Sequence, residues 1–250
     1  MILEVKNISK YFTIERGVFK AEAGLVKALD GVSFSVNEYD TLGIVGESGS
    51  GKTTLAKIII DLIPATSGEV VFAPELIQDL RKDVQIVFQN PYNSLNPKMR
   101  ISEILSEPLL IHNIVPKPFI KERTLELLRL VGLDEDVLGR FPIEFSGGQR
   151  QRICIARALA SQPKFIILDE PISSLDLIIQ AQMLDLFFEL KQRLKLTYIF
   201  VSHNLAVVKH IADSVLVMEN GRVVEMGNID EIFYSPKHPY TKALLDAARS

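Results

Sequence analysis

The chain has 250 residues, 47% hydrophobic and 24% charged, which is the composition of a globular protein with one substantial core. Its formal net charge of −3 provides no positive field for nucleic acid or an anionic membrane, and its single cysteine, Cys154, excludes an internal disulfide. We therefore expect a reducing compartment. The first residues do not form a signal peptide, and no apolar run reaches the roughly 18 residues of a membrane span. Any role at a membrane is expected to depend on a partner.

The N-terminal segments predict a half-exposed antiparallel sheet. Residues 2–8 alternate loosely between apolar and polar side chains, and residues 32–36 alternate clearly. The mixed-charge residues 11–27 between them predict an extended hairpin or loop, which begins with the aromatic pair Tyr11 and Phe12.

A glycine-rich turn, GESGSGKTT, occupies residues 46–54 and fits the pattern G-x-x-x-x-G-K-[ST]. The apolar run 41–45 before it predicts a buried strand. After it, apolar residues recur at helical spacing up to Pro64, which is expected to stop the helix; they are Leu55, Ile58, Ile59 and Leu62. In such a turn, backbone N–H groups and the positive end of the helix dipole converge on phosphate oxygens. A chance match arises in roughly 1% of chains of this length, so the turn predicts nucleotide binding.

The whole turn forms the predicted phosphate-binding set, which is Gly46, Glu47, Ser48, Gly49, Ser50, Gly51, Lys52, Thr53 and Thr54. Lys52 is expected to reach the β- and γ-phosphates, and the Thr53 hydroxyl is expected to hold Mg²⁺. An exposed ring near this site could stack on adenine. Tyr11 and Phe12 are both candidates, although either ring could instead pack onto the core.

The residues after the loop helix predict more strands and then a helical insert. A turn at 66–69 leads to a strand at 70–72, and the apolar run 84–88 predicts a buried strand that ends at Gln89. The Gln89 carbonyl oxygen could ligate Mg²⁺, or its amide could simply satisfy loop backbone. Residues 101–138 then have a helical pattern.

The insert is expected to contain two main helices. The first covers residues 101–111 and is expected to be kinked or broken at Pro108, and the second covers residues 121–131. We therefore predict a helical lobe at 91–160, inserted into a core formed by 1–90 and 161–250.

The segment Ser146, Gly147, Gly148 and Gln149 opens a predicted helix at 150–160. A glycine-rich helix start is a second potential anion site, although a flexible Gly-Gly start is the alternative. The four-residue pattern arises by chance in roughly 0.5% of chains. Two phosphate-binding segments with only one G-x-x-x-x-G-K-[ST] turn suggest that each segment completes the site of a partner chain.

The apolar run 165–168 predicts a buried strand that ends in Asp169 and Glu170. A carboxylate at a strand end can hold Mg²⁺ through water, which is the role expected of Asp169. The next residue, Glu170, can orient or deprotonate an attacking water. An acid pair can also form a surface turn or a helix cap, but the glycine-rich loop upstream favours the functional interpretation.

The C-terminal part predicts a helix at 177–194, a buried strand at 197–201, and a hairpin of 214–218 with 222–225 around Asn220-Gly221. His203 follows the strand and could contact a γ-phosphate, although a lone histidine is more often a bystander. No chemistry is assigned to the other histidines, which are His112, His210 and His238. Buried strands that alternate with helices predict an α/β fold with a parallel sheet.

Taken together, these motifs resemble the nucleotide-binding subunits of ATP-binding cassette (ABC) transporters over nearly the whole chain. The resemblance identifies 46–54 as Walker A, Gln89 as the Q-loop glutamine, 146–149 as the signature, 165–169 as Walker B and 173–176 as the D-loop. It implies a P-loop NTPase (RecA-like) core with an N-terminal antiparallel β subdomain and an inserted α-helical subdomain.

The same resemblance assigns individual roles. It implies that Glu170 is the catalytic carboxylate and that Lys52 and His203 contact the γ-phosphate. It also favours Phe12 over Tyr11 as the residue that stacks on adenine.

Two further stretches, 87–97 and 235–245, are similar to those of the oligopeptide, dipeptide and nickel importer ATPases. The resemblance therefore implies an ATPase that uses ATP and Mg²⁺ to power import. Its expected partners are a second ABC ATPase subunit, integral membrane permease subunits and, indirectly, an extracytoplasmic solute-binding protein, but no nucleic acid. Its expected location is peripheral, on the cytoplasmic face of the cell membrane.

Two alternatives belong to other classes. A soluble ABC-type ATPase that acts on nucleic acid or ribosomes usually has a coiled-coil insert or two cassettes, and neither is found here; the acidic charge also argues against direct nucleic-acid binding. A signalling GTPase would need an N/T-K-x-D segment, which the sequence lacks.

Overall fold

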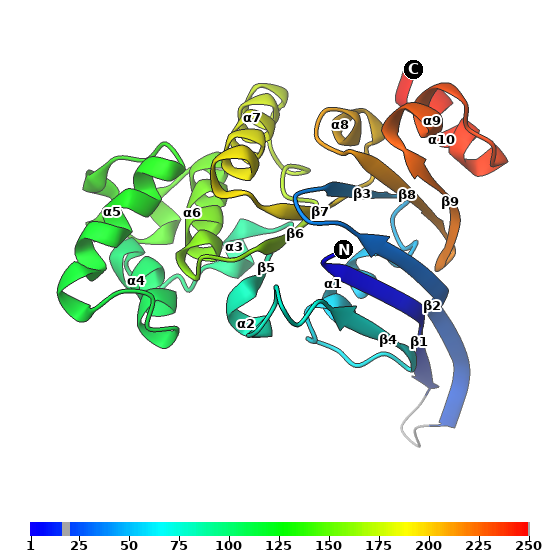
Figure 1. Ribbon diagram of the computed structural model, residues 1–250, viewed down its shortest axis with the longest axis horizontal. Coiled ribbons are helices and arrows are strands. Elements are labelled where there is room, and N and C mark those ends of the chain that lie inside the picture. The colour runs from blue at the N-terminus through cyan, green and yellow to red at the C-terminus, as the bar shows by residue number, and fades with distance from the viewer. Residues whose placement is uncertain (17–20, 250) are drawn as a thin grey trace. The chain divides into compact units, whose positions relative to one another are not determined.

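The structure, a computed structural model, describes residues 1–16 and 21–249 (Figure 1). The chain packs into two compact units, one formed by Met1–Ile77 with Ile199–Ser250 and the other by Gln78–Tyr198. Within the described ranges, no helix has both the length and the hydrophobicity needed to cross a bilayer.

The first unit contains mostly strands. In chain order its elements are β1 (Leu3–Arg16), β2 (Ala21–Val36), β3 (Thr41–Val45), α1 (Lys52–Ile59), β4 (Ser67–Phe72), the last part of β7 (Thr197–Ser202), α8 (Leu205–Lys209), β8 (Ser214–Glu219), β9 (Arg222–Asn228), α9 (Ile229–Tyr234) and α10 (Pro239–Arg249).

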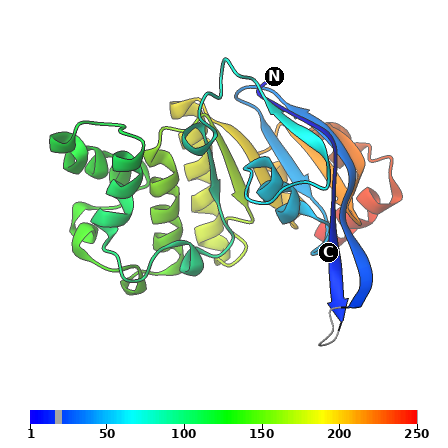
Figure 2. The ribbon, with the colours of Figure 1, turned by 90° about the horizontal axis from the view of Figure 1, so that it is seen from below.

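Strands β1, β2 and β4 form an antiparallel sheet with the order β2-β1-β4. β1 and β2 run side by side as a long hairpin (Figure 2). The predicted antiparallel sheet is confirmed, and both strands extend well into the predicted hairpin of residues 11–27. Residues 17–20, which the prediction also covers, lie outside the described residues.

A second group of strands in this unit supports the glycine-rich loop. β3 lies parallel to β8, and all five residues of β3 are buried, as its apolar sequence requires. β8 and β9 form the predicted antiparallel hairpin. Its turn residues Asn220 and Gly221 have φ angles of 48° and 79°, the positive values that a tight two-residue turn needs.

The second unit is mainly helical. In chain order its elements are α2 (Leu80–Asp83), β5 (Val84–Val87), α3 (Pro91–Ser94), α4 (Ile101–Ile111), η1 (Lys117–Phe119), α5 (Ile120–Leu130), η2 (Glu135–Gly139), η3 (Pro142–Glu144), α6 (Gly147–Ala160), β6 (Phe165–Asp169), α7 (Leu177–Leu194) and the start of β7.

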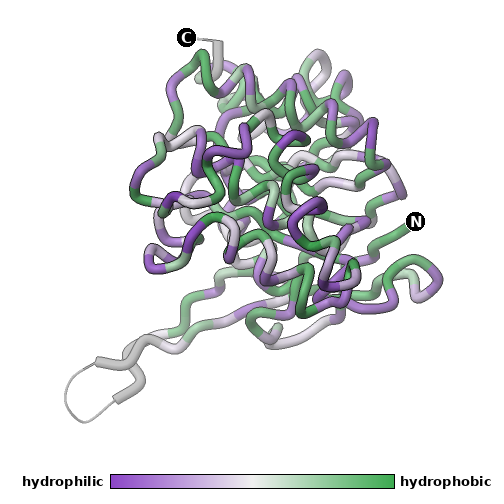
Figure 3. Tube along the Cα trace, turned by 90° about the vertical axis from the view of Figure 1, so that its left-hand side faces the viewer, coloured by the Kyte–Doolittle hydropathy of each residue, from purple (hydrophilic) through white to green (hydrophobic). Residues whose placement is uncertain are grey.

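In this unit β5 lies parallel to β6, and the five residues of β6 are all buried. Helices α4, α5 and α6 pack against one another. Hydrophobic and hydrophilic residues are interspersed along the chain (Figure 3), and the buried residues of α4 are the apolar Ile101, Ile104, Leu105 and Leu109. The parallel pairs β3–β8 and β5–β6 confirm the predicted α/β class.

Two local expectations were wrong. Helix α1 ends at Ile59, before Leu62, because Asp61 adopts a left-handed conformation with φ of 56°. Leu62 is therefore 51% exposed instead of core-facing, and Pro64 does not end the helix. The predicted turn at 66–69 belongs largely to β4, which begins at Ser67.

At Pro108 the sequence predicts a kink or a break in the helix, and the structure excludes the break. Helix α4 is continuous from Ile101 to Ile111. Its residues Ile104, Leu105 and Leu109 are buried, so packing outweighs the backbone hydrogen bond that proline cannot donate.

Candidate functional site

The glycine-rich loop connects β3 to α1 by a path that only glycine can follow. Gly46 and Gly51 have φ angles of 154° and 102°. A Cβ atom at Gly46 would lie 2.2 Å from the carbonyl oxygen of Met218, and one at Gly51 would lie 2.4 Å from that of Ala28. The loop backbone is thus pressed against β8 and β2, and a side chain at either position would displace it.

Lys52 begins α1 and is only 4% exposed. Its ammonium group donates hydrogen bonds to the carbonyl oxygens of Gly46 and Glu47, at 2.7 and 2.8 Å, and lies 3.5 Å from the Ser50 hydroxyl. The positive charge is therefore held inside the loop by the loop's own carbonyl groups. The next residue, Thr53, is exposed in the first turn of the helix, at the positive end of the helix dipole.

Two N–H groups of the loop already have partners within the protein. Ser50 N–H donates to the Glu47 carbonyl oxygen at 3.2 Å, and Glu47 N–H donates to the hydroxyl of Tyr240 at 3.0 Å. The sequence motifs did not identify Tyr240 as part of the site. Its only signal is that it lies within the 235–245 stretch, which indicates subfamily resemblance alone.

The two candidate aromatic residues have different environments. Tyr11 donates a hydrogen bond to Asp30 at 3.1 Å, and Asp30 also accepts from Arg222 at 2.5 Å. These bonds, first that from Arg222 and then that from Tyr11, lower the pKa of the Asp30 carboxyl. Phe12 is 43% exposed, and the Lys10 ammonium lies 5.1 Å from its ring centroid. The Tyr11 hydroxyl is therefore bonded within a polar cluster, whereas the Phe12 ring is exposed and can contact a ligand.

In the second unit, Gln89 and Glu170 are adjacent. The Gln89 side-chain nitrogen donates to Glu170 Oε2 at 3.1 Å and lies 3.4 Å from the hydroxyl oxygen of Ser173. Because Gln89 follows β5 and Glu170 follows β6, the parallel pairing of these strands brings both side chains to the same sheet edge. Ser173 was placed in the D-loop by resemblance, but its closeness to Gln89 was not foreseen.

The acid pair ends β6 in an unusual backbone conformation. Asp169 is 3% exposed, whereas Glu170 is half-buried. Glu170 has a φ angle of 48°, which is rarely adopted by residues with a side chain and is concentrated at functional sites. The turn therefore directs two consecutive carboxylates into different environments, as two different roles would require.

The Ser146–Gln149 segment forms the start of α6, which begins at Gly147 rather than at Arg150 as expected. Ser146 N–H donates to Gln149 Oε1 at 3.1 Å, and Gln149 N–H donates to Ser146 Oγ at 3.3 Å. This reciprocal capping arrangement fixes the helix start. Ser146 and Gln149 are exposed, so the segment is available to another molecule.

His203 directly follows β7 and is exposed. It precedes Asn204, whose side chain accepts from the Ala206 N–H at 2.9 Å and caps α8. The buried strand on one side and the capped helix on the other give His203 a fixed position on the backbone.

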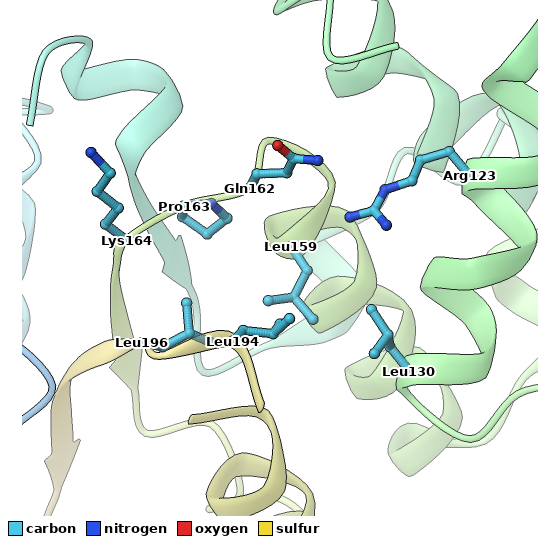
Figure 4. A pocket seen from close by; sticks show the side chains of 8 residues that line it. All are labelled: Arg123, Leu130, Leu159, Gln162, Pro163, Lys164, Leu194 and Leu196. Atoms are coloured by element: carbon cyan, nitrogen blue, oxygen red, sulfur yellow. The ribbon is translucent and has the colours of Figure 1, made fainter. Parts of the chain in front are cut away.

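A pocket of about 310 Å³ lies elsewhere in the second unit. Leucine side chains lie toward its centre, and Arg123 extends toward them from α5 (Figure 4). Its lining residues are Arg123, Leu130, Leu159, Gln162, Pro163, Lys164, Leu194 and Leu196. None of these is a predicted site residue, so the pocket is separate from the nucleotide chemistry described above.

Comparison with known proteins gives concordant results. Residues 29–173 match the family model described as ABC transporter. The chain is 47% identical to the di/tripeptide transport ATP-binding protein DppF of Pseudomonas aeruginosa, with 98% of this chain and 78% of the relative covered. It is 48% identical to the oligopeptide transport ATP-binding protein AppF of Bacillus subtilis, with the same coverage.

Two solved structures share the fold. CbiO1 of Clostridium perfringens, part of the ABC transporter complex cbiONQ, has a TM-score of 0.77 and 28% identity, with 94% of this chain and 91% of that chain covered. The ATP-binding cassette MJ0796, in a dimeric post-hydrolysis state with ADP and Pi, also has a TM-score of 0.77 and 28% identity, with 91% of this chain and 99% of that chain covered. These matches confirm the predicted P-loop NTPase fold, and the chain belongs to the ABC transporter family.

Proposed function

We propose that this chain is the ATP-binding and ATP-hydrolysing subunit of an importer for oligopeptides or dipeptides. The observation that carries the proposal is its identity of 47–48% with peptide-transport ATP-binding proteins across 98% of its length. The glycine-rich loop and the acid pair supply the chemistry that this function needs. Nickel import is the other substrate class that the sequence resemblance leaves open.

In this proposal the loop 46–54 binds the phosphates of ATP. Its backbone N–H groups and the α1 dipole attract the phosphate oxygens, and Lys52 exchanges its two carbonyl partners for the β- and γ-phosphates. The exposed ring of Phe12 stacks on adenine. Tyr11 remains in the cluster with Asp30.

Of the proposed hydrolytic groups, Glu170 and Gln89 belong to the second unit and His203 to the first. Glu170 orients and deprotonates the attacking water, and Gln89 holds the Glu170 carboxylate in place through its amide nitrogen. His203 contacts the γ-phosphate. A general base in this position contributes about 10²–10⁴-fold to the rate.

Magnesium is the expected metal because the candidate donors are all oxygen atoms, from the Thr53 hydroxyl, the Gln89 amide and the Asp169 carboxylate. Within residues 1–16 and 21–249, no group of three or more His, Cys, Asp and Glu side chains could hold a metal ion. Mg²⁺ would therefore bind together with ATP and neutralise charge that develops on the phosphates.

Dimerisation gives the exposed Ser146–Gln149 segment a function. We propose that two cassettes face each other head to tail, so that 146–149 of one chain binds the γ-phosphate held by 46–54 of the other. The dimeric state of the related MJ0796 cassette supports this arrangement. Hydrolysis removes the γ-phosphate and with it the contact that holds the dimer closed.

The remaining assignments follow from this function. The second subunit is a copy or a close relative of this chain, and permease subunits receive the movement through residues 89–97 and the helical lobe 91–160. In this proposal the nucleotide-binding core comprises 1–90 and 161–250. An extracytoplasmic solute-binding protein delivers the solute, and this chain lies on the cytoplasmic face of the membrane.

Uptake measurements test the proposal. Cells in which Glu170→Gln replaces the wild-type chain should lose import of labelled di- or oligopeptides, while nickel uptake and ribosome assembly stay normal. Purification of the tagged chain from detergent-solubilised membranes should recover an integral membrane subunit. Normal peptide uptake in these cells, or recovery of ribosomes in place of a membrane subunit, would contradict the importer function and favour the soluble alternative.

A further inference from the structure

Residues 235–245, the C-terminal stretch that resembles the peptide importers, contact the phosphate-binding loop. Tyr240 is in the first turn of α10, and its hydroxyl accepts a hydrogen bond from the Glu47 N–H at 3.0 Å. Both residues belong to the first compact unit. A C-terminal side chain therefore bonds directly to the backbone of the loop.

The bond from Tyr240 involves the Gly46–Glu47 peptide, which also forms a hydrogen bond with Lys52. The Glu47 N–H and the Gly46 C=O belong to the same planar peptide. The C=O accepts from the Lys52 ammonium at 2.7 Å, while the N–H donates to Tyr240. Rotation of this peptide would break both bonds. Gly46 has no Cβ to hinder rotation about its Cα–C bond, so the two hydrogen bonds help to hold this peptide in place.

Tyr240 itself is held firmly by its surroundings. The Glu225 carboxylate on β9 accepts from the N–H groups of Lys237 and His238, at 2.7 and 3.0 Å, just before α10 begins. Thr241, the residue after Tyr240, is fully buried. The backbone on either side of Tyr240 is thus anchored, by the Glu225 carboxylate before the helix and by the burial of Thr241 after it.

The protonation state of Tyr240 suits this role. Burial raises the pKa of the Tyr240 hydroxyl, and it outweighs the hydrogen bond from the Glu47 N–H, which lowers that pKa; the Glu47 and Glu219 carboxylates add smaller upward shifts. The group therefore remains a neutral hydroxyl at physiological pH, and its oxygen can accept the Glu47 N–H without adding a negative charge beside the phosphate site.

We propose that Tyr240 is a positioning residue for the phosphate-binding loop, which fixes the Gly46–Glu47 peptide and thereby the place of the Lys52 ammonium before ATP arrives. The proposal rests on the proposed nucleotide-binding function of the loop. Tyr240 acts through the backbone and does not contact the nucleotide. The 235–245 stretch is then a support for the ATP site.

The test compares three variants of the full chain. Tyr240→Phe removes the hydroxyl and keeps the ring. Tyr234→Phe is the matched control, because its hydroxyl also makes one hydrogen bond, with the Lys209 ammonium at 3.1 Å, in the same C-terminal region. Lys52→Ala tests the loop itself.

We expect Tyr240→Phe to weaken ATP binding about fivefold, the usual effect of one hydrogen bond. The kcat at saturating ATP should stay within about twofold, because bound phosphates position Lys52 once ATP is present. The control Tyr234→Phe should match the wild type in both. Equal ATP affinity in Tyr240→Phe and wild type, with binding lost in Lys52→Ala, would overturn the role of Tyr240 only. Normal binding in Lys52→Ala would instead overturn the nucleotide function of the loop.

A measurement at the bond itself separates positioning from general stability. In ATP-free protein, hydrogen exchange at the Glu47 amide, followed by NMR, should speed up at least about fivefold in Tyr240→Phe. Amides of the β3 core should keep their rates. Unchanged exchange at Glu47, or an equal increase throughout the unit, would show that the hydroxyl does not fix this peptide.

Discussion

The side-chain nitrogen of Gln89 donates a hydrogen bond to Glu170 Oε2 across 3.1 Å. One end of the glutamine amide thus faces the proposed catalytic carboxylate, while the other end carries the oxygen proposed to ligate Mg²⁺. A single side chain can therefore connect the metal with the base. Movement of the strand-to-helix segment that begins at Gln89 would affect both partners together.

Glu170→Gln should separate ATP binding from hydrolysis. The amide has nearly the shape of the carboxylate but cannot accept a proton from water, so we expect kcat to fall by at least about 100-fold with ATP affinity unchanged. The ATP-bound dimer should accumulate, visible as a larger species in size-exclusion chromatography. A hydrolysis rate like that of the wild type would refute the assigned role.

Gln89→Glu should change the pH dependence of hydrolysis. The new carboxylate would face Glu170 at hydrogen-bond distance, and two like charges so close favour a shared proton. The acidic limb of the pH–rate profile should therefore move to higher pH. Gln85→Glu is the matched control, because Gln85 lies on β5, the strand that precedes Gln89, and bonds to the Arg81 carbonyl instead. A shift in both variants, or in neither, would argue against a specific Gln89–Glu170 contact.

Phe12→Ala should weaken ATP binding by about tenfold, since stacking of a base on an aromatic ring contributes about 1–3 kcal/mol. Phe12→Trp should retain the affinity. Tyr11→Phe, which loses only the hydrogen bond to Asp30, should bind ATP as the wild type does. Titration with ATP measures all three, and full affinity in Phe12→Ala would exclude Phe12 as the residue that stacks on adenine.

Lys52→Ala should abolish measurable ATP binding in calorimetric titration. The change removes the charge that meets the β- and γ-phosphates, and it leaves the carbonyl groups of Gly46 and Glu47 without their donor. Circular dichroism should confirm that the variant is folded. Undiminished ATP affinity would exclude the loop as the phosphate site.

Cys154 should be unreactive in the folded protein. Burial raises the pKa of its thiol to about 11, so little thiolate is present at pH 8 and alkylation by iodoacetamide should require denaturant. The unfolded chain releases this proton at lower pH than the folded protein does. The thiol therefore lowers the free energy of unfolding as the pH rises from about 9 to 11, by at most about 1.4 kcal/mol per pH unit.

Cys154→Ala isolates this contribution, because lysines and tyrosines also titrate in that range. Urea titrations at pH 8 and 10 measure the free energy of unfolding of both proteins. Between these two pH values, the free energy of unfolding of the wild type should fall more than that of Cys154→Ala. An unchanged difference, or rapid alkylation of the folded protein, would contradict the burial of the thiol.

The sequence predicted the elements whose signals are local and strong. Helix α7 has the predicted bounds, Leu177–Leu194, because its length and apolar pattern allow no competing structure. The motifs alone were also sufficient to identify the family. Each motif is a short run of residues, and its backbone conformation depends on the residue types within that run, as with the glycines of the phosphate-binding loop.

Expectations failed or stayed open where local rules competed with packing or with a single backbone angle. The left-handed conformation of Asp61 ends α1 early and exposes Leu62, and periodicity could not indicate that. At Pro108 the sequence left a kink and a break open, and α4 continues through it because the apolar neighbours of Pro108 are buried in the helical unit.

The sequence by itself determined the fold class, the family and the chemical type of each site residue, since these depend on residue identities at short spacing. Only the tertiary structure decided which residues meet. Gln89 reaches Glu170, and Tyr240 reaches Glu47, across long stretches of chain. Such contacts depend on strand pairing and helix packing of the whole unit, and no local pattern of residues encodes them.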